Sequence, residues 1–200
     1  MGPVIMNKPT KLRCGNTNAY FVKSPSGGLL IDTDYAGTLR VFFKAVKASG
    51  IGIGDISHVM ATHYHPDHIG LIGELQELGV KLLLVDLQKD SVHFADRIFS
   101  REKLAYKPVR EADAQVIRCE DSRAFLAEIG IGGEIISTPS HSADSVSVIL
   151  DSGDCIVGDL EPLEYSAGYD DSAALTADWE RILRYGPKRI LYAHANEKTL

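Results

Sequence analysis

Three histidines and one aspartate fall within six residues, in the segment Thr62-His63-Tyr64-His65-Pro66-Asp67-His68. The apolar stretch 56–61 before it is typical of a short strand, and the stretch 69–78 after it has the apolar spacing of a helix that ends at Gly79. Histidine and aspartate side chains are common ligands of zinc and related metals. The segment therefore predicts a metal site at a strand-to-helix junction.

The rest of the chain alternates between predicted strands and helices. Wholly apolar or period-two stretches predict strands, and apolar residues three or four positions apart predict helices. The predicted strands are 19–23, 28–32, 56–61, 80–85, 115–118, 134–138, 145–151, 155–158 and 188–193, and the predicted helices are 35–49, 69–78, 122–129 and 172–185. No repeat or linker-like stretch interrupts this order, so we expect one mixed α/β domain over residues 1–200.

The stretch 87–107 also has a helical pattern, but it is rich in charge. We interpret it as a helix with a solvated face, and the alternative is an insertion that lies over the site. His93 has no partner at helical spacing that would make it a metal ligand. Whether this stretch forms a lid is left open by the sequence.

Composition narrows the class of partner. The net charge of -6 argues against a general affinity for nucleic acids or anionic membranes, and no apolar run approaches the roughly 18 residues of a membrane span. The first residues lack a secretion signal, so we expect a cytoplasmic protein with a small-molecule substrate. Cys14, Cys119 and Cys155 are too far apart for a thiolate zinc knuckle and are expected to be free thiols. The oligomeric state is not determined.

Five of the seven histidines follow predicted strands, namely His63, His65, His68, His141 and His194. In open α/β folds, ligands gather at the carboxyl ends of strands, so distant parts of the chain converge there. His63 and His65 alternate along an extended backbone and point the same way, whereas Pro66 turns the chain before Asp67 and His68.

These directions predict two sets of ligands. We expect His63 and His65 to hold one metal with His141, and Asp67 and His68 to hold a second with His194. Each set has three protein ligands and leaves room for water. Asp159 follows the predicted strand 155–158, and its two oxygens can bridge metals about 3.5 to 4 Å apart. The alternative for Asp159 is a turn or capping residue.

The same residues carry a family resemblance. Thr62 to His68 resembles the His-x-His-x-Asp-His signature of the metallo-β-lactamase superfamily. Further similar segments are Leu29-Leu30-Ile31-Asp32-Thr33, Thr138-Pro139-Ser140-His141-Ser142, Val157-Gly158-Asp159 and Ala193-His194. The resemblance implies a four-layer αββα sandwich, with two mixed β-sheets face to face, helices outside and a dinuclear metal site at one edge. Ser140, Asp144 and Ala195 depart from the family pattern, which affects the expected loop shape but no ligand.

The resemblance also implies a metal-dependent hydrolase. Two divalent ions, expected to be zinc with iron or manganese also compatible, lower the pKa of a bridging water toward about 7, so that hydroxide attacks a small ester, thioester or lactone. Asp67 is expected to orient this water and carry its proton. Asp32 and Thr62 are expected to accept hydrogen bonds from ligand histidines. Candidate oxyanion or substrate contacts are Tyr64, Tyr165 and Tyr169, with plain packing as their alternative.

Two other functions fit the same residues. One is a mononuclear iron-dependent dioxygenase that resembles the persulfide dioxygenases, which share the fold and part of the ligand set. The other is a metal-binding sensor module without turnover, because a fold and a metal site do not by themselves imply catalysis. Metal analysis combined with assays of hydrolysis and oxygen consumption separates the three functions.

Overall fold

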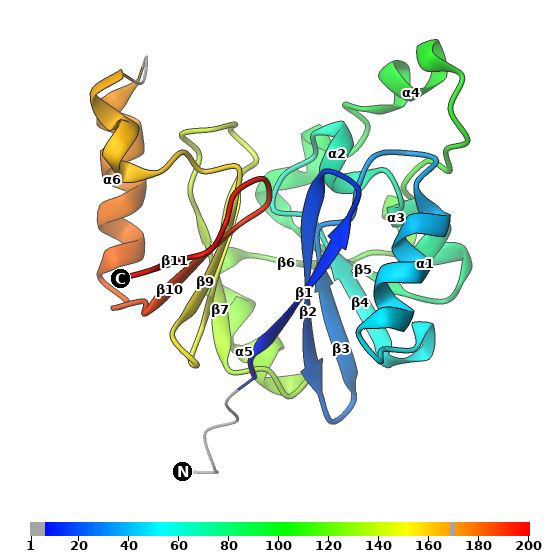
Figure 1. Ribbon diagram of the computed structural model, residues 1–200, viewed down its shortest axis with the longest axis horizontal. Coiled ribbons are helices and arrows are strands. Elements are labelled where there is room, and N and C mark those ends of the chain that lie inside the picture. The colour runs from blue at the N-terminus through cyan, green and yellow to red at the C-terminus, as the bar shows by residue number, and fades with distance from the viewer. Residues whose placement is uncertain (1–6, 169–170) are drawn as a thin grey trace.

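The computed structural model describes residues 7–168 and 171–200 of the chain. Two β-sheets face each other at the centre, and helices cover their outer sides (Figure 1). The first sheet has the order β1 (Pro9–Cys14), β2 (Thr17–Ser24), β3 (Gly27–Ile31), β4 (Ile56–Met60), β5 (Lys81–Val85) and β6 (Gln115–Ile117). The second has the order β11 (Lys198–Thr199), β10 (Arg189–Tyr192), β9 (Asp154–Gly158), β8 (Val146–Leu150) and β7 (Gly133–Ser137).

Three hydrophobic cores separate the four layers. The α-helices are α1 (Leu39–Ala48), α2 (Pro66–Ile69), α3 (Ile72–Glu77), α4 (Asp96–Glu102), α5 (Ser122–Glu128) and α6 (Ser172–Leu183). Side chains alternate along the strands, so Leu30 packs toward α1 and α3, whereas Leu29 and Ile31 pack between the sheets. Ile190 and other residues of the second sheet pack against Trp179 of α6. The expected αββα sandwich is confirmed.

The carboxyl ends of several strands meet at one edge of the sandwich. Strands β3, β4 and β5 are mutually parallel, as are β9 and β10, whereas β1–β2, β2–β3, β7–β8 and β8–β9 are antiparallel. Parallel neighbours end on the same side, so the residues that follow β3, β4, β9 and β10 emerge together near α2 (Figure 1). The fold thus assembles the site at this edge.

Two strands were not predicted. β1 pairs with β2 from Pro9 to Cys14, but only Leu12 and Cys14 of that strand are buried, so its hydrophobic alternation is short and broken by exposed charges. β11 has two exposed residues and carries no apolar pattern at all. Both are edge strands, and their pairing comes from backbone hydrogen bonds that a side-chain pattern does not reveal.

The single helix expected over 69–78 is wrong in its bounds. The chain forms a one-turn helix from Pro66, which fixes the backbone for a first helical position, and then a second helix from Ile72. The carbonyl of His68 accepts hydrogen bonds from both the backbone N–H and the hydroxyl of Thr33, which end the first helix. At the break, a Cβ on Gly70 would lie 2.2 Å from the backbone nitrogen of Ala36, so only glycine fits.

The stretch 87–107 is not one continuous helix either. A 3-10 helix, η2 (Asp86–Ser91), is followed by α4, which ends where Lys103 takes a left-handed conformation with φ of 55°. Arg97, Arg101, Lys103 and Lys107 are all exposed, in keeping with a solvated face. His93 contacts Asp96 and Glu111 at 2.8 and 2.9 Å, so it links two surface segments and takes no part in the metal centre.

The described residues include no helix with both the length and the apolar composition that a membrane crossing requires.

The three cysteines are free thiols in the structure. Burial raises the pKa of Cys14 to about 12 and that of Cys119 to about 11, and burial also raises the pKa of Cys155. The thiolate is the reactive form, so all three are expected to be unreactive at pH 8.

We predict that an aromatic disulfide reagent does not label Cys14 or Cys155 in the native protein and labels the half-buried Cys119 only slowly, if at all. In guanidinium the reagent is expected to label all three thiols of the chain. Rapid labelling of all three without denaturant would contradict the buried placement.

Candidate metal centre

The segment that carries four of the candidate metal ligands is held between the two sheets. It leaves β4 after Met60 and enters α2 at Pro66, and its Thr62 carbonyl accepts a hydrogen bond of 2.8 Å from the backbone N–H of Val146, at the start of β8. Thr62 and His63 are 1% exposed and His68 is 0% exposed. The ligand segment is therefore fixed by the cores on both sides.

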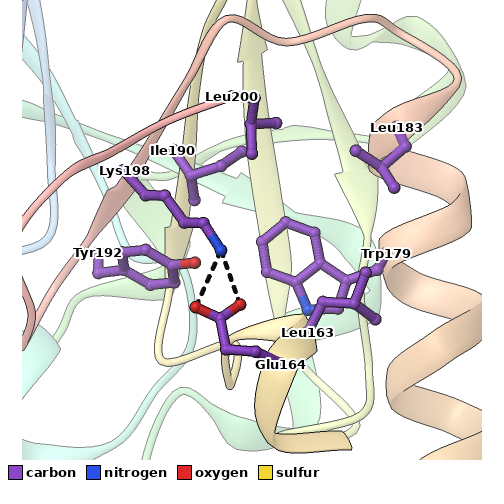
Figure 2. Close-up of a pocket in the computed structure, with 8 residues that line it drawn as sticks. All are labelled: Leu163, Glu164, Trp179, Leu183, Ile190, Tyr192, Lys198 and Leu200. Atoms are coloured by element: carbon purple, nitrogen blue, oxygen red, sulfur yellow. Dashed lines mark hydrogen bonds and ion pairs between the residues drawn. The ribbon is translucent and has the colours of Figure 1, made fainter.

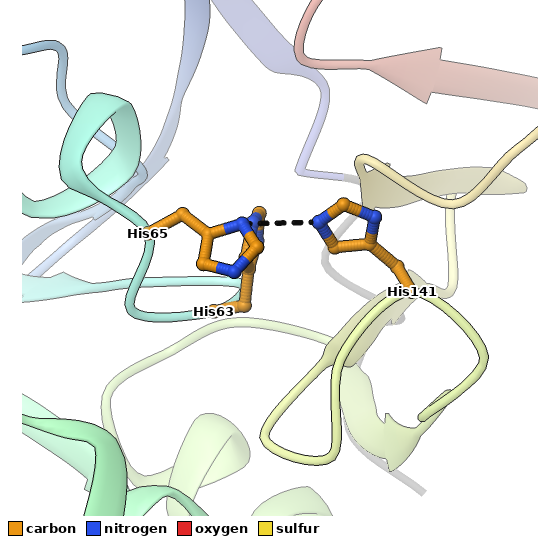
Figure 3. A group of neighbouring side chains, drawn as sticks. All are labelled: His63, His65 and His141. Carbon is orange, nitrogen blue, oxygen red and sulfur yellow. Dashed lines mark hydrogen bonds between the residues drawn. The ribbon is translucent and has the colours of Figure 1, made fainter. Parts of the chain in front are cut away.

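The first ligand group joins the two sheets. His63 and His65 come from the segment after β4, and His141 comes from the turn between β7 and β8 (Figure 3). The Nε2 atom of His141 lies 3.2 Å from Nδ1 of His65, the contact marked in Figure 3. The ring of His63 lies 4.5 Å from that of His65 and 4.7 Å from that of His141, measured between centroids. The three rings surround one point.

The second ligand group contains Asp67, His68, Asp159 and His194. The Nε2 atom of His194 lies 3.0 Å from Oδ2 of Asp67 and 3.3 Å from Oδ1 of Asp159. The Nε2 atom of His68 lies 3.3 Å from the same oxygen of Asp159. Four donor atoms, from α2 and from the ends of β9 and β10, thus converge beside the first group.

Asp159 lies between the groups and faces both. Its Oδ1 belongs to the second group, whereas its Oδ2 lies 3.8 Å from Nε2 of His63 and 3.9 Å from Nε2 of His141. Gly158 has a φ of +58°, and a Cβ there would lie 2.4 Å from the hydroxyl of Thr62. Glycine is thus required for β9 to approach Thr62 closely enough to place Asp159 between the histidines.

The donor atoms fit metal ions. Ligands that each lie 2.0 to 2.1 Å from a tetrahedral ion are about 3.3 Å apart, and the closest donor pairs within each group are separated by 3.2 Å in the first and by 3.0 to 3.3 Å in the second. Among the buried atoms without a hydrogen-bond partner are Nε2 of His63, Nε2 of His68 and Oδ1 of Asp159. Buried polar atoms are normally satisfied, and metal coordination would satisfy these three.

The protonation of the donors suits coordination in the first group. Burial lowers the pKa of His63 and of His141, so both rings are neutral at pH 7 and keep a lone pair. In the second group, burial lowers the pKa of His68, but Asp32 and Asp159 outweigh burial and raise it to about 10. Burial raises the pKa of Asp67, but its hydrogen bond to His194 and the charge of the neighbouring His68 together outweigh burial, and the pKa falls to about 2. The carboxylates here therefore attract positive charge.

Asp32 and Thr62 fix the orientation of two ligand rings. Asp32 accepts hydrogen bonds from the backbone N–H of Thr62 at 2.6 Å and from its hydroxyl at 2.9 Å, and it lies 3.1 Å from Nδ1 of His68. Because a carboxylate only accepts, the Thr62 hydroxyl donates to Asp32 and accepts from Nδ1 of His63, 3.2 Å away. Both histidines thus turn Nε2 toward the site.

Two supporting residues were missed from the sequence. The amide of Gln88 donates to the carbonyls of Ala61, Thr62 and Asp144, and the Asp144 carboxylate accepts from the backbone N–H of Tyr64 at 2.7 Å. Both side chains are buried, and they hold the ligand segment from η2, which follows β5, and from the loop between β7 and β8. The departure of Asp144 from the family pattern was the one available signal, whereas nothing distinguished Gln88.

The three tyrosines have different positions. Tyr64 is 1% exposed in the core beneath α1 and α3, so the packing alternative applies and its expected substrate contact is withdrawn. Tyr165 is 61% exposed and lines a cavity of about 340 Å³ together with His141, Asp159 and His194. Tyr169 lies outside the described residues. An aromatic side chain that the sequence did not indicate, Phe94, lies 5.5 Å from the His65 ring, centroid to centroid, and is 56% exposed.

Known proteins share this fold. The metallo-beta-lactamase family protein TTHA1429 from Thermus thermophilus superposes with a TM-score of 0.74 at 18% identity, over 97% of this chain and 75% of its own. The structure "TTHA1623 in a di-iron-bound form" gives a TM-score of 0.69 at 24% identity, over 96% of this chain and 94% of its own.

Two animal proteins are among the similar sequences. The "Beta-lactamase-like protein 2 homolog" of Drosophila melanogaster is 28% identical over 94% of this chain, and "Metallo-beta-lactamase domain-containing protein 1" of Homo sapiens is 23% identical over 91%. The chain spans only 61% and 64% of the length of these two relatives. The model of the Metallo-beta-lactamase superfamily matches residues 12–194, which include all seven candidate ligands. This chain therefore belongs to the metallo-beta-lactamase superfamily.

Proposed function

We propose that this protein is a dinuclear metal-dependent hydrolase that acts on a small ester, thioester or lactone. The observation that carries the proposal is the placement of seven donor side chains in two adjacent groups, with Asp159 of the second group facing His63 of the first through its Oδ2 atom. A site for a single ion needs only three or four of these donors, and the remaining buried nitrogens would stay unsatisfied. Zinc suits the imidazole and carboxylate donors, and iron or manganese is also compatible.

The bound ions would lower the pKa of water and polarise the substrate carbonyl. The chain's own residues supply the rest. Asp67 is ionised and half-exposed at the beginning of α2, where its carboxylate orients the attacking water and accepts its proton. The water oxygen bonds to the acyl carbon, the bond from that carbon to the leaving oxygen or sulfur breaks, and the proton passes from Asp67 to the leaving group. The products are a carboxylic acid and an alcohol or thiol.

The cavity above the ligands limits the substrate. Its volume of about 340 Å³ is suited to a compact reacting group, and its walls are formed by the residues after β9 and β10. Glu161, Pro162, Tyr165 and Ala195 line it beside the candidate ligands. The Tyr165 hydroxyl is proposed to donate to the oxygen on which negative charge develops.

Metal analysis and activity on one preparation test the proposal. We expect two ions per chain, and hydrolysis of short 4-nitrophenyl esters, thioesters or lactones that a chelator abolishes and added zinc, iron or manganese restores. One iron per chain with oxygen consumption would replace the proposal with the dioxygenase function. Two ions without turnover across the screen would favour the sensor function.

A further inference from the structure

A second cavity lies beside the one above the metal ligands. It has a volume of about 280 Å³ and is enclosed by α6, β10, β11 and the 3-10 helix η5 (Leu163–Gly168), as Figure 2 shows. Its lining residues are Leu163, Glu164, Trp179, Leu183, Ile190, Tyr192, Lys198 and Leu200. Most of these are apolar, in contrast to the imidazoles and carboxylates of the metal centre.

The cavity has a buried floor and an exposed apolar rim. Ile190, Trp179 and Tyr192 are at most 5% exposed and form the floor. Leu163, Leu183 and Leu200 are 37%, 43% and 55% exposed. Large apolar side chains that stay exposed around a concave surface are typical of a binding site rather than of ordinary surface.

The charges of this cavity compensate each other. The ammonium group of Lys198 lies 2.9 and 2.7 Å from the two carboxylate oxygens of Glu164, and Figure 2 shows this pair between Tyr192 and Trp179. Trp179 donates its ring N–H to the carbonyl of Glu161 at 2.8 Å, so this polar group is also satisfied. The cavity therefore presents no uncompensated charge to a ligand, and an uncharged apolar group suits it best.

The two cavities share a wall. Tyr192 lines both of them, and η5 contributes Leu163 to one and Tyr165 to the other. Ile190 and Tyr192 lie on the same face of β10, about 6.6 Å apart along the strand, and His194 follows two residues later. Among the described residues, Tyr192 is thus the one side chain that lines both cavities, and an acyl chain extending from the metal ligands would have to pass it to enter the apolar cavity.

We propose that the apolar cavity binds the acyl chain of the substrate, so that the preferred substrates are esters or thioesters of linear, medium-length fatty acids. This inference rests on the proposed hydrolase function and names its substrate class. An apolar cavity of about 150 Å³ holds a benzene ring, so 280 Å³ is room for roughly ten carbon atoms. The carbonyl carbon would lie at the metal centre and the methyl end beside Trp179.

A series of 4-nitrophenyl esters from acetyl to dodecanoyl tests the proposal on the metal-loaded protein. We expect kcat/KM to rise about twofold to fourfold for each added methylene up to roughly eight to ten carbons, and then to level off. A flat profile, or the highest activity with acetyl, would overturn the acyl-chain proposal and leave the hydrolase function intact. If none of the esters is hydrolysed at any chain length, the proposed hydrolase function itself is contradicted.

A binding measurement does not depend on turnover. Trp179 is the only tryptophan of the chain and lies in the floor of the cavity, so its fluorescence reports occupancy directly. We expect octanoate to shift the Trp179 emission with saturation, and acetate at the same concentrations to leave it unchanged. No response to octanoate, or an equal response to acetate, would overturn the proposal even if the esters are hydrolysed.

Two substitutions test whether the apolar cavity, rather than any exposed apolar side chain, sets the preference for long acyl chains. Leu183→Gln places an amide in the rim at the end of α6, and we expect it to lower the octanoyl-to-acetyl ratio of kcat/KM about tenfold and to weaken octanoate binding. Leu78→Gln is the matched control, because Leu78 is 50% exposed after the end of α3 and lines neither cavity. Equal effects of the two substitutions would contradict the proposal. It would also be contradicted if the wild-type protein self-associates and only Leu183→Gln abolishes this, because the cavity rim would then be a contact between two copies of the chain.

Discussion

Replacing Asp67 by alanine is expected to lower ester hydrolysis by about a thousandfold or more and to reduce the metal content from two ions to one. Its Oδ2 atom lies 3.0 Å from Nε2 of His194 and 3.9 Å from Nε2 of His68, so the substitution removes both a ligand and the proposed proton acceptor. Asp67 is 36% exposed, so the substitution should leave the fold intact. Metal quantification and kcat/KM on the same purified variant make the measurement.

Asp113→Ala is the control for this prediction. That carboxylate is 64% exposed and pairs with Arg110 on the surface, where removal of one ion-pair partner costs little. We expect normal metal content and normal hydrolysis in this variant. Unchanged activity and metal content in Asp67→Ala would reject the two-metal centre.

The second large effect is expected from Asp32→Ala. Asp32 is 1% exposed, and its removal leaves the Thr62 N–H and the His68 ring without an acceptor in a buried site. Breaking such a buried pair typically destabilises a protein by about 3 to 5 kcal/mol. Asp32 also has a φ of 61°, a conformation that alanine adopts less readily than aspartate or asparagine. Denaturant unfolding of the metal-free protein measures this loss.

Asp32→Asn separates the charge from the backbone and packing effects. Asparagine tolerates the left-handed backbone and keeps one acceptor for Thr62, so we expect a smaller loss of stability than with alanine. The negative charge beside His68 is lost in both variants, and metal affinity should fall about 10-fold to 100-fold. Equal stability of the two variants and the wild type would show that Asp32 does not support His68.

Local sequence determined the centre of the site. The segment from His63 to His68 carries four candidate ligands within six residues, and an extended stretch followed by Pro66 places their side chains on different sides of the backbone. Apolar runs also predicted most strands, since the central strands bury side chains on both faces of a sheet. These are properties of neighbouring residues, which sequence patterns report directly.

The convergence of the distant candidate ligands was expected from their positions after strands. Which oxygen of Asp159 lies near which histidine nitrogen was decided by the tertiary structure. Only the close approach of Gly158 to Thr62 places the two oxygens of Asp159 toward different groups. Gln88 supports the ligand segment through carbonyls from two parts of the chain, and no local pattern signals such a contact.

The sequence by itself therefore predicted a mixed α/β chain from its periodicity and the candidate ligands from a dense local motif, and the resemblance carried by that motif implied the family and the layered fold. Tertiary structure alone revealed the apolar cavity beside Trp179, whose walls come from η5, α6, β10 and β11. The physical reason is that a cavity is bounded by side chains from segments far apart in the chain, each of which, taken alone, is typical of an ordinary core or surface residue.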